Sequence, residues 1–280
     1  MFQLALEVGL ALLGLAFFAE LIDSSMGMGY GTTLTPLLLI LGFEPLQVVP
    51  AILISELVTG LLAGFTHHAI GNADFKPKTM NLARIYKSFR EMGFRKSVEK
   101  GLPMNLKVAL LIASCSIIGT VIAVFIAVNI PKFWLKIYIG GLVLIIGIIV
   151  IATVNKTYAF SWRKVSILGI IASFNKGMSG GGYGPVVTSG QILSGVDGKN
   201  AVAITSLAEG LTCLVGVILY ALTDTNLDLS LAPYLTIGAV LSVYPSAFLV
   251  KSIKPKTFRK AIGMLTIILG IMSLYNTLVS

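Results

Sequence analysis

The feature that most constrains this chain is a series of uninterrupted apolar runs. A helix needs roughly 20 apolar residues to cross about 30 Å of hydrocarbon. Runs that approach this length cover residues 46–70, 108–128, 133–153, 201–222, 231–250 and 258–278. With 56% hydrophobic and only 12% charged residues, the chain also lies far from the composition of a soluble globular domain. The sequence therefore predicts an all-α, multi-pass integral protein of the cell (plasma or inner) membrane.

The basic residues indicate how the chain is oriented. A formal net charge of +9 would suit nucleic-acid binding, but the lysines and arginines gather in connections between apolar runs. Nine lie within residues 71–107 and five within 251–260, whereas the connection at 223–230 carries Asp224 and Asp228 and no base. Positive connections tend to remain in the cytoplasm. We therefore expect a basic cytoplasmic loop at 71–107, both chain ends on the outer side, membrane lipid as a partner, and no nucleic acid.

An internal repeat divides the chain. Sliding the chain on itself by 153 residues aligns Gly29-Tyr30-Gly31 with Gly182-Tyr183-Gly184. An offset of 124 aligns Pro131-Lys132 with Pro255-Lys256, and the shorter offset reflects the longer basic loop of the first half. We predict a first repeat at 1–153 and a second at 154–280. An odd number of complete crossings per half inverts the second half relative to the first, as in many alternating-access transporters.

Each repeat is expected to contain a re-entrant or broken hairpin followed by three transmembrane helices. The runs at 165–174 and 185–193 are each about half a span at 1.5 Å per residue, and 33–41 matches the second of them. The first run, 4–22, is longer than its mate, so a complete crossing there stays open. The count then ranges from eight full-span equivalents to ten helical segments, and the half-helices should meet near the midplane.

The hairpin tips are the expected substrate site. They read DSSMGMGYGTT over 23–33 and NKGMSGGGYGP over 175–185, and glycines let a ligand approach the main chain. Broken backbone is tolerated in a bilayer only where protein or a water-filled cavity surrounds it. A half-helix begins after each tip, and its N-terminal dipole favours an anion. The substrate-binding candidates are Asp23, Ser24, Ser25, Gly27, Gly29, Gly31, Thr32, Thr33, Asn175, Lys176, Gly177, Ser179, Gly180, Gly181, Gly182, Gly184, Thr188 and Gln191.

Charged residues inside apolar segments need a partner or a function. Lys176 aligns with Asp23, so an ion pair between the tips is one interpretation, and contact of Lys176 with the substrate is another that is compatible with it. Glu56 and Glu209 occupy equivalent points in full spans. A carboxyl group in an apolar span tends to hold its proton, so these two are candidates either for proton coupling or for tying helices together as neutral acids.

The remaining acidic, histidine and cysteine residues in or near the apolar runs are weaker candidates for a functional role. Glu20 is a further intramembrane acid with no acidic mate, and His67 and His68 are expected at the cytoplasmic end of a span in an interfacial role. Cys115 and Cys213 lie in apolar runs without metal-ligand spacing and suit packing. The sequence indicates no organic cofactor and no metal.

The segments GYGTTLTPLLLILGFEPLQVVPA (29–51) and MSGGGYGPVVTSGQILSGVDGKNAVAITSLAEG (178–210) give the chain a resemblance to a known family. In these segments and over nearly its whole length the chain resembles the sulfite exporter TauE/SafE permeases. The resemblance implies a small inorganic or organic sulfur anion, such as sulfite, a sulfonate or thiosulfate, as substrate. The first tip carries Asp23 and fewer glycines than the family usually shows, and the basic loop resembles an extension. A homodimer stays open.

Three other functions compete with a proton-coupled anion carrier. A passive anion channel uses the same electrostatics. An intramembrane serine protease would use the Gly177-Met178-Ser179-Gly180 motif, but no histidine follows Ser179 to act as its base. A structural or sensory membrane protein would not need charged residues at this depth, where they are costly. The prediction is therefore a transporter and not an enzyme.

Overall fold

The protein is an all-α integral membrane protein. The computed structural model describes residues 6–79, 81–153, 161–223, 227–250 and 255–279, and every regular element in these ranges is a helix. Seven of the described helices, α1, α3, α5, α6, α9, α10 and α11, are long and apolar enough to cross a membrane. Large apolar side chains such as Phe125, Ile148 and Leu222 are more than half exposed on the outside of the bundle. Such a surface suits lipid, because lipid tails are as apolar as these side chains.

Apart from α4, described below, the described helices form two series of five helices each. The first series is α1 (Leu6–Met26), α2 (Tyr30–Ile40), α3 (Pro45–Ala69), α5 (Met104–Asn129) and α6 (Lys132–Thr153). The second series is α7 (Trp162–Ser179), α8 (Tyr183–Leu193), α9 (Gly198–Thr223), α10 (Ala232–Leu249) and α11 (Pro255–Val279). The short α2 and α8 both have 11 residues, and α3 and α9 have 25 and 26.

The two series pack against each other in reciprocal pairs. α1 lies along α10 and α7 lies along α5, so the first helix of each series contacts the fourth of the other. α3 pairs with α9 and α6 pairs with α11, and these pairs join equivalent members. In the same way, α2 contacts α11 and α8 contacts α6. A two-fold relation between the series would produce this exchange of partners.

Small residues let the equivalent helices approach closely. A Cβ atom on Gly60 of α3 would lie 2.8 Å from the backbone nitrogen of Gly210 on α9. A Cβ atom on Gly147 of α6 would lie 2.9 Å from the carbonyl oxygen of Gly263 on α11. Membrane helices without a hydrophobic driving force between them rely on this kind of close packing. The α3–α9 crossing brings together Glu56 on α3 and Glu209 on α9.

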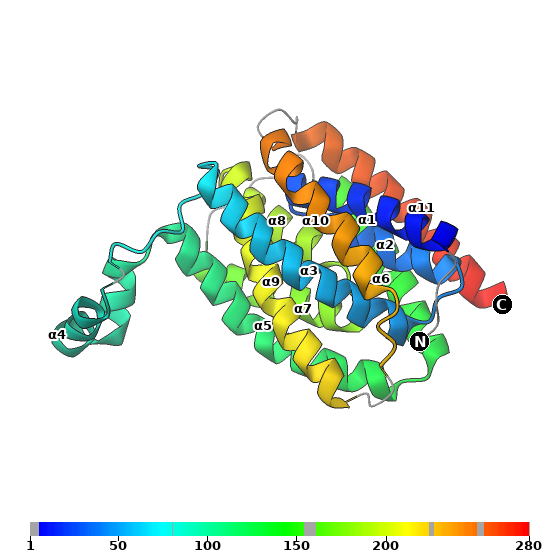
Figure 1. Cartoon of the computed structure of the whole chain (residues 1–280), viewed down its shortest axis with the longest axis horizontal. Coiled ribbons are helices and arrows are strands. Elements are labelled where there is room, and N and C mark those ends of the chain that lie inside the picture. The colour runs from blue at the N-terminus through cyan, green and yellow to red at the C-terminus, as the bar shows by residue number, and fades with distance from the viewer. Residues whose placement is uncertain (1–5, 80, 154–160, 224–226, 251–254, 280) are drawn as a thin grey trace.

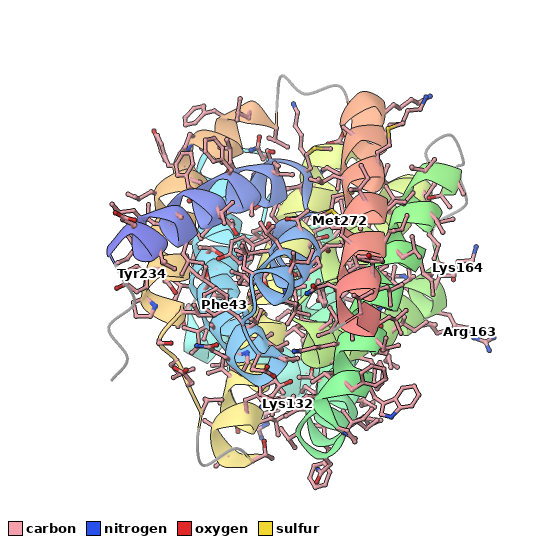
Figure 2. The ribbon with its side chains drawn as sticks, turned by 90° about the vertical axis from the view of Figure 1, so that its right-hand side faces the viewer. Phe43, Lys132, Arg163, Lys164, Tyr234 and Met272 are labelled. Atoms are coloured by element: carbon pink, nitrogen blue, oxygen red, sulfur yellow. The ribbon has the colours of Figure 1, made fainter. Side chains whose placement is uncertain are left out.

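The basic connection forms a helix outside the bundle. α4 (Leu82–Gly101) lies within the predicted loop 71–107, and its helix is broken at Gly93, where φ is 75°. Figure 1 shows α4 standing clear of the bundle, whereas α1 begins and α11 ends at the opposite side of the picture. The start of α1 and the end of α11 therefore lie away from the basic segment. Figure 2 shows Arg163 and Lys164 projecting from the edge of the bundle at the start of α7, and Met272 on the outward face of α11.

The first arm of the second hairpin is longer than the sequence predicts. We expected a half-length segment at 165–174, but α7 continues to Ser179 and has 18 residues, close to the 21 of α1. The helix can continue through the polar residues 175–177 because Lys176 has acidic partners inside the bundle, described below. The second arms agree with the expected segments 33–41 and 185–193, although each begins two or three residues earlier, at a tyrosine.

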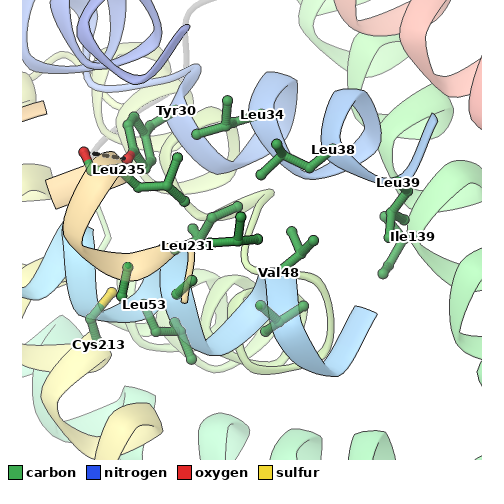
Figure 3. Packing of buried hydrophobic residues seen from close by; sticks show 14 of the residues in the cluster. Tyr30, Leu34, Leu38, Leu39, Val48, Leu53, Ile139, Cys213, Leu231 and Leu235 are labelled. Atoms are coloured by element: carbon green, nitrogen blue, oxygen red, sulfur yellow. Dashed lines mark hydrogen bonds between the residues drawn. The ribbon is translucent and has the colours of Figure 1, made fainter. Parts of the chain in front are cut away.

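The short second arms are held inside protein. Tyr30, Leu34 and Leu38 of α2 pack against α3 and against Leu231 and Leu235 at the start of α10 (Figure 3), and the three α2 side chains are at most 1% exposed. Tyr183 and Val187 of α8 are buried to the same extent in a second cluster. The backbone breaks between the arms are thus surrounded by protein, which is the condition for tolerating them at membrane depth.

Candidate substrate site at the hairpin tips

Each hairpin turns within three residues. α1 and α2 are joined by residues 27–29, and α7 and α8 by residues 180–182. The first glycine of each turn has positive φ, 67° at Gly27 and 69° at Gly180, a conformation that residues with a Cβ atom rarely adopt. α2 and α8 therefore begin inside the bundle, and the first turn of each helix has N–H groups that no intrahelical bond satisfies.

The two tips touch each other at equivalent positions. A Cβ atom on Gly31 would overlap the carbonyl group of Gly180, and one on Gly184 would overlap the carbonyl group of Gly27. Both contacts follow the 153-residue repeat, since Gly31 corresponds to Gly184 and Gly27 to Gly180. The structure thus brings the tips together, as the sequence predicts.

Hydrogen bonds between the tips are only partly symmetric. The Gly182 N–H donates to Thr32 Oγ1 at 3.1 Å, and Thr188 Oγ1 donates to the Gly27 carbonyl at 2.6 Å. The equivalent of Thr188 is Thr35, which lies beside Gly180 but whose buried hydroxyl has no hydrogen-bond partner in the described part of the chain. One cross-link between the halves is therefore made and its mirror image is not.

Lys176 is the charged centre of this region. Its ammonium group forms ion pairs with Glu56 on α3 and with Glu209 on α9, where Nζ lies 2.8 Å from Oε1. The three side chains are 1%, 4% and 5% exposed. The glutamates occupy equivalent positions of the repeat, and the close crossing of α3 and α9 brings them together. One lysine from the second tip thus pairs with a carboxylate from each half.

Asp23 is the third carboxylate of the cluster, but it does not form the expected pair with Lys176. Oxygens of Asp23, Glu56 and Glu209 lie within 4.8 Å of one another. Asp23 Oδ1 instead accepts the N–H of Tyr30 at 3.2 Å and so caps the start of α2. Repeat alignment suggested the Asp23–Lys176 pair, whereas the described structure directs Lys176 to the glutamates because α3 and α9 cross beside α7. Three converging carboxylates can hold a cation, and here the lysine ammonium group lies against two of them.

A fourth acid lies next to the cluster. Glu20 is 2% exposed and accepts a hydrogen bond from the hydroxyl of Ser24, one turn further along α1. Its second oxygen, Oε2, has no partner among the described residues. The equivalent position in the second half is Ser173. Among the described residues, the cluster of Glu20, Asp23, Glu56 and Glu209 therefore has more acidic side chains than bases, with Lys176 as its ammonium partner.

His67 lies inside the protein and not at its surface. The sequence predicts an interfacial role for His67, but its side chain is 0% exposed. Its Nε2 lies 2.9 Å from the carbonyl oxygen of Ser24, and Asn72 Nδ2 lies 2.9 Å from its Nδ1. Asn72 also donates to the Ala247 carbonyl on α10 at 3.0 Å. The burial follows because α1 runs far enough to bring its last turn beside the end of α3. His68 is partly buried and contacts the loop at Ala73.

The second half repeats this contact with a different side chain. Tyr220 is the equivalent of His67 and Gly177 the equivalent of Ser24. The Tyr220 hydroxyl donates to the Gly177 carbonyl at 2.8 Å. In both halves, a side chain near the end of the third helix of the series therefore contacts the backbone carbonyl of the equivalent residue in the first arm of the hairpin.

Two tyrosines that the sequence analysis did not select fasten the second arms. The Tyr30 hydroxyl lies 2.7 Å from Ser55 Oγ on α3, and Thr212 Oγ1 on α9 lies 3.2 Å from the Tyr183 hydroxyl. Both tyrosines are fully buried. The signal that could have found them is the GYG motif itself, which repeats an aromatic residue between the two glycines.

Several predicted hydrogen-bond donors serve their own helix or a neighbour. Ser25 and Thr33 donate to carbonyls of their own hairpin, and Gln191 Nε2 donates to Thr205 Oγ1 at 3.0 Å. Asn175 Oδ1 accepts from the Tyr138 hydroxyl on α6 at 2.9 Å. Ser189 is buried and its hydroxyl has no partner among the described residues. The structure therefore gathers Asp23, Lys176, Glu56 and Glu209 into one cluster and gives most of the hydroxyl groups structural partners.

Comparison with known proteins identifies the family. The sulfite exporter TauE/SafE family matches residues 12–83 and 92–273, which is most of the chain. The chain belongs to this family of membrane transporters. The interruption of the match at 84–91 falls within α4, so this TauE/SafE protein carries part of its basic segment as an addition to the shared pattern.

A curated relative supports transport without naming a substrate. The "Probable membrane transporter protein YtnM" of Bacillus subtilis is 29% identical over 183 residues. The aligned part is 62% of this TauE/SafE protein and 51% of the relative, so the match spans about half the relative's length. No solved structure matches the chain.

Membership of a transporter family favours transport over catalysis, and the surroundings of Ser179 agree. Its hydroxyl donates to the Asn175 carbonyl at 2.8 Å and accepts the Gly181 N–H at 3.1 Å. These bonds end α7 and shape the turn. The histidine nearest the first tip, His67, is bound to Ser24 and Asn72 and not to Ser179. In this TauE/SafE protein, Ser179 therefore acts as a turn residue in the described structure.

Proposed function

We propose that this protein is a secondary transporter that moves a small sulfur-containing oxyanion across the membrane by alternating access. The observation that carries the proposal is Lys176, a buried base at the meeting point of two hairpin tips. A lysine at membrane depth is costly and usually belongs to a substrate or ion pathway. In this family member Lys176 lies in the last turn of α7, and α8 begins after the three-residue turn that follows, with a helix dipole that also favours negative charge.

The substrate class follows from the family and from the size of the site. Sulfite, thiosulfate and small sulfonates present compact oxygen groups that suit an ammonium group and a helix N-terminus. The tips approach within backbone contact, so an occupant of this region must be small. The family's description as sulfite exporters supports sulfur oxyanions over other small anions.

A carrier mechanism explains the closed centre better than a passive channel does. In the described part of the chain, Lys176, Glu56 and Glu209 are buried and the two tips are joined by hydrogen bonds, whereas conduction requires an open polar path. The reciprocal packing of the two series supports an inverted repeat, in which the two halves can swap conformations and so open the site to alternate sides of the membrane. We propose the division at 1–153 and 154–280 with the segment 71–107 in the cytoplasm. A cysteine in place of Lys78 should then react with a membrane-impermeant thiol reagent from the cytoplasmic side only.

Flux through proteoliposomes tests the transport proposal. Uptake of radiolabelled thiosulfate, sulfite and methanesulfonate should saturate for at least one anion and should accelerate when the unlabelled anion is inside, as expected of a carrier. Lys176→Ala should abolish uptake, whereas Lys132→Ala, which removes an exposed lysine paired with Glu44, should not. Uptake that does not saturate and is unaffected by internal anion would identify a channel. No flux of any of these anions would reject the substrate class.

A further inference from the structure

We propose that anion and proton transport share one site, because the anion reaches Lys176 by displacing Glu56, Glu209 or both, and each displaced glutamate must first take up a proton. This inference rests on the proposed transport function and specifies its driving ion. In the closed structure both glutamates form ion pairs with the Lys176 ammonium group, so a substrate anion must compete with the two carboxylates for the same cation. Protons remove the competitors.

The geometry leaves Lys176 little capacity for a further anion. An ammonium group has three donors, and two of them point to Glu56 and Glu209. All three side chains are nearly fully buried, so an ionised carboxylate displaced by substrate would remain as an uncompensated charge in the bundle. Protonation converts each glutamate to a neutral acid that can leave the lysine without that penalty.

The other groups that face Lys176 do not replace the glutamates as its partners. Asp23 caps α2, and Glu20 is bound to Ser24 on the same helix. Next to Gly177, the residue that follows the lysine, α5 presents Thr120 and Ala123, neither of which titrates. Among the described residues, Tyr30 on α2 and Cys213 on α9 also interact with the lysine electrostatically. Tyr138 on α6 contacts the adjacent Asn175, and Tyr183 on α8 lies near Glu209. The charge balance at the site is therefore controlled by carboxylates.

Charge conservation sets the ratio of protons to anion. The ammonium group and two carboxylates together carry one net negative charge. Two protons on the glutamates and a bound divalent anion restore the same net charge, whereas a monovalent anion needs one proton. We therefore expect about two protons per thiosulfate and about one per methanesulfonate, because a buried site disfavours any change in its net charge.

The proton transfer is balanced within the cycle. On the entry side, water donates a proton to each displaced carboxylate oxygen, and Lys176 keeps its own proton throughout. On the exit side the anion leaves, the glutamates return their protons to water, and the ion pairs with Lys176 form again. Substrate and protons thus move in the same direction.

The experiment measures protons taken up per anion transported. Proteoliposomes containing a pH-sensitive dye and the full-length protein are given radiolabelled thiosulfate or methanesulfonate, with no membrane potential. In wild type, an inward proton gradient should drive accumulation of both anions, with a ratio about twice as high for thiosulfate. In the Glu56→Gln/Glu209→Gln double variant, the ratio should fall by at least about tenfold, because amides cannot carry the proton. Glu44→Gln, which removes an exposed carboxylate paired with Lys132 and Lys136, is the matched control and should keep the wild-type ratio.

The outcomes separate this inference from the transport proposal. Anion-for-anion exchange by wild type without any proton uptake would overturn proton coupling and leave the transporter intact. An unchanged ratio in the double variant would show that other groups carry the protons, which also overturns the inference. If folded wild-type protein exchanges none of the anions, both proposals fail together. Folding of each variant is checked by its elution from a size-exclusion column in detergent.

Discussion

The two hairpin tips share one backbone design but carry opposite charges at equivalent positions. Both have a long first arm, a three-residue turn with glycines at positive φ, and an 11-residue second arm that begins at a buried tyrosine. The first tip carries Asp23 and the second carries Lys176 at the same place in the repeat. Asp23 caps its own hairpin, whereas Lys176 reaches across to both long helices.

This difference separates what the repeat needs for folding from what it needs for function. The glycine contacts and the tyrosine anchors occur in both halves, because the two tips must interlock to satisfy backbone groups inside the bundle. The charged residue of the tip is acidic in the first half and basic in the second, because a single cation between Glu56 and Glu209 is enough to hold these two glutamates together. The halves are therefore alike in their backbone contacts and unlike in the charges that they carry.

The largest expected effect comes from the contacts that both tips share. Gly31→Ala and Gly184→Ala should each destabilise the protein by about 3 kcal/mol or more, because the added Cβ would overlap a carbonyl group of the other tip. Thermal unfolding in detergent, followed by circular dichroism, measures this change. Gly14→Ala is the matched control, since nothing lies within 4 Å of its Cβ position. Equal tolerance of all three substitutions would contradict the interlocked arrangement.

A smaller effect should distinguish the two equivalent threonines. Thr188→Val removes the donor to Gly27 and should cost about 1–2 kcal/mol, because a buried carbonyl loses its partner. Thr35→Val replaces a hydroxyl without a partner in the described structure and should change stability by less than about 0.5 kcal/mol. The same unfolding measurement compares the two variants. Equal costs would mean that the missing cross-link forms in solution and that the tips are more symmetric than the structure shows.

The smallest effect concerns the side chains that hold the first arms. Tyr220→Phe removes one donor to the Gly177 carbonyl and should cost about 1 kcal/mol. His67→Gln retains a donor for Ser24 and should cost less than His67→Phe, which loses the bonds to both Ser24 and Asn72. Hydrogen exchange of the tip amides would show the loosening in the half that carries the substitution. Loosening of both tips to the same degree would indicate that they move as one unit.

The sequence by itself determined the membrane location, and it predicted the repeat and the position of the site. Apolar runs, the 153-residue offset and the two glycine tips are patterns of residue type and spacing along the chain, so they can be recognised without knowing which helices touch. The same patterns named Lys176, Glu56 and Glu209 as candidates for a function. They did not reveal the length of α7, because helix continuation through residues 175–177 depends on the acids that compensate Lys176.

Only the tertiary structure decided which charges pair and which side chains are buried. Alignment of the repeat put Asp23 opposite Lys176, but equivalence in sequence is not proximity in space. The lysine lies instead where α3 and α9 cross, and that crossing depends on Gly60 and Gly210 packing across the two halves. The burial of His67 has the same origin, since it depends on how far α1 runs beside α3. Contacts between distant segments are set by helix packing, and a repeat pattern records only that the two halves are alike.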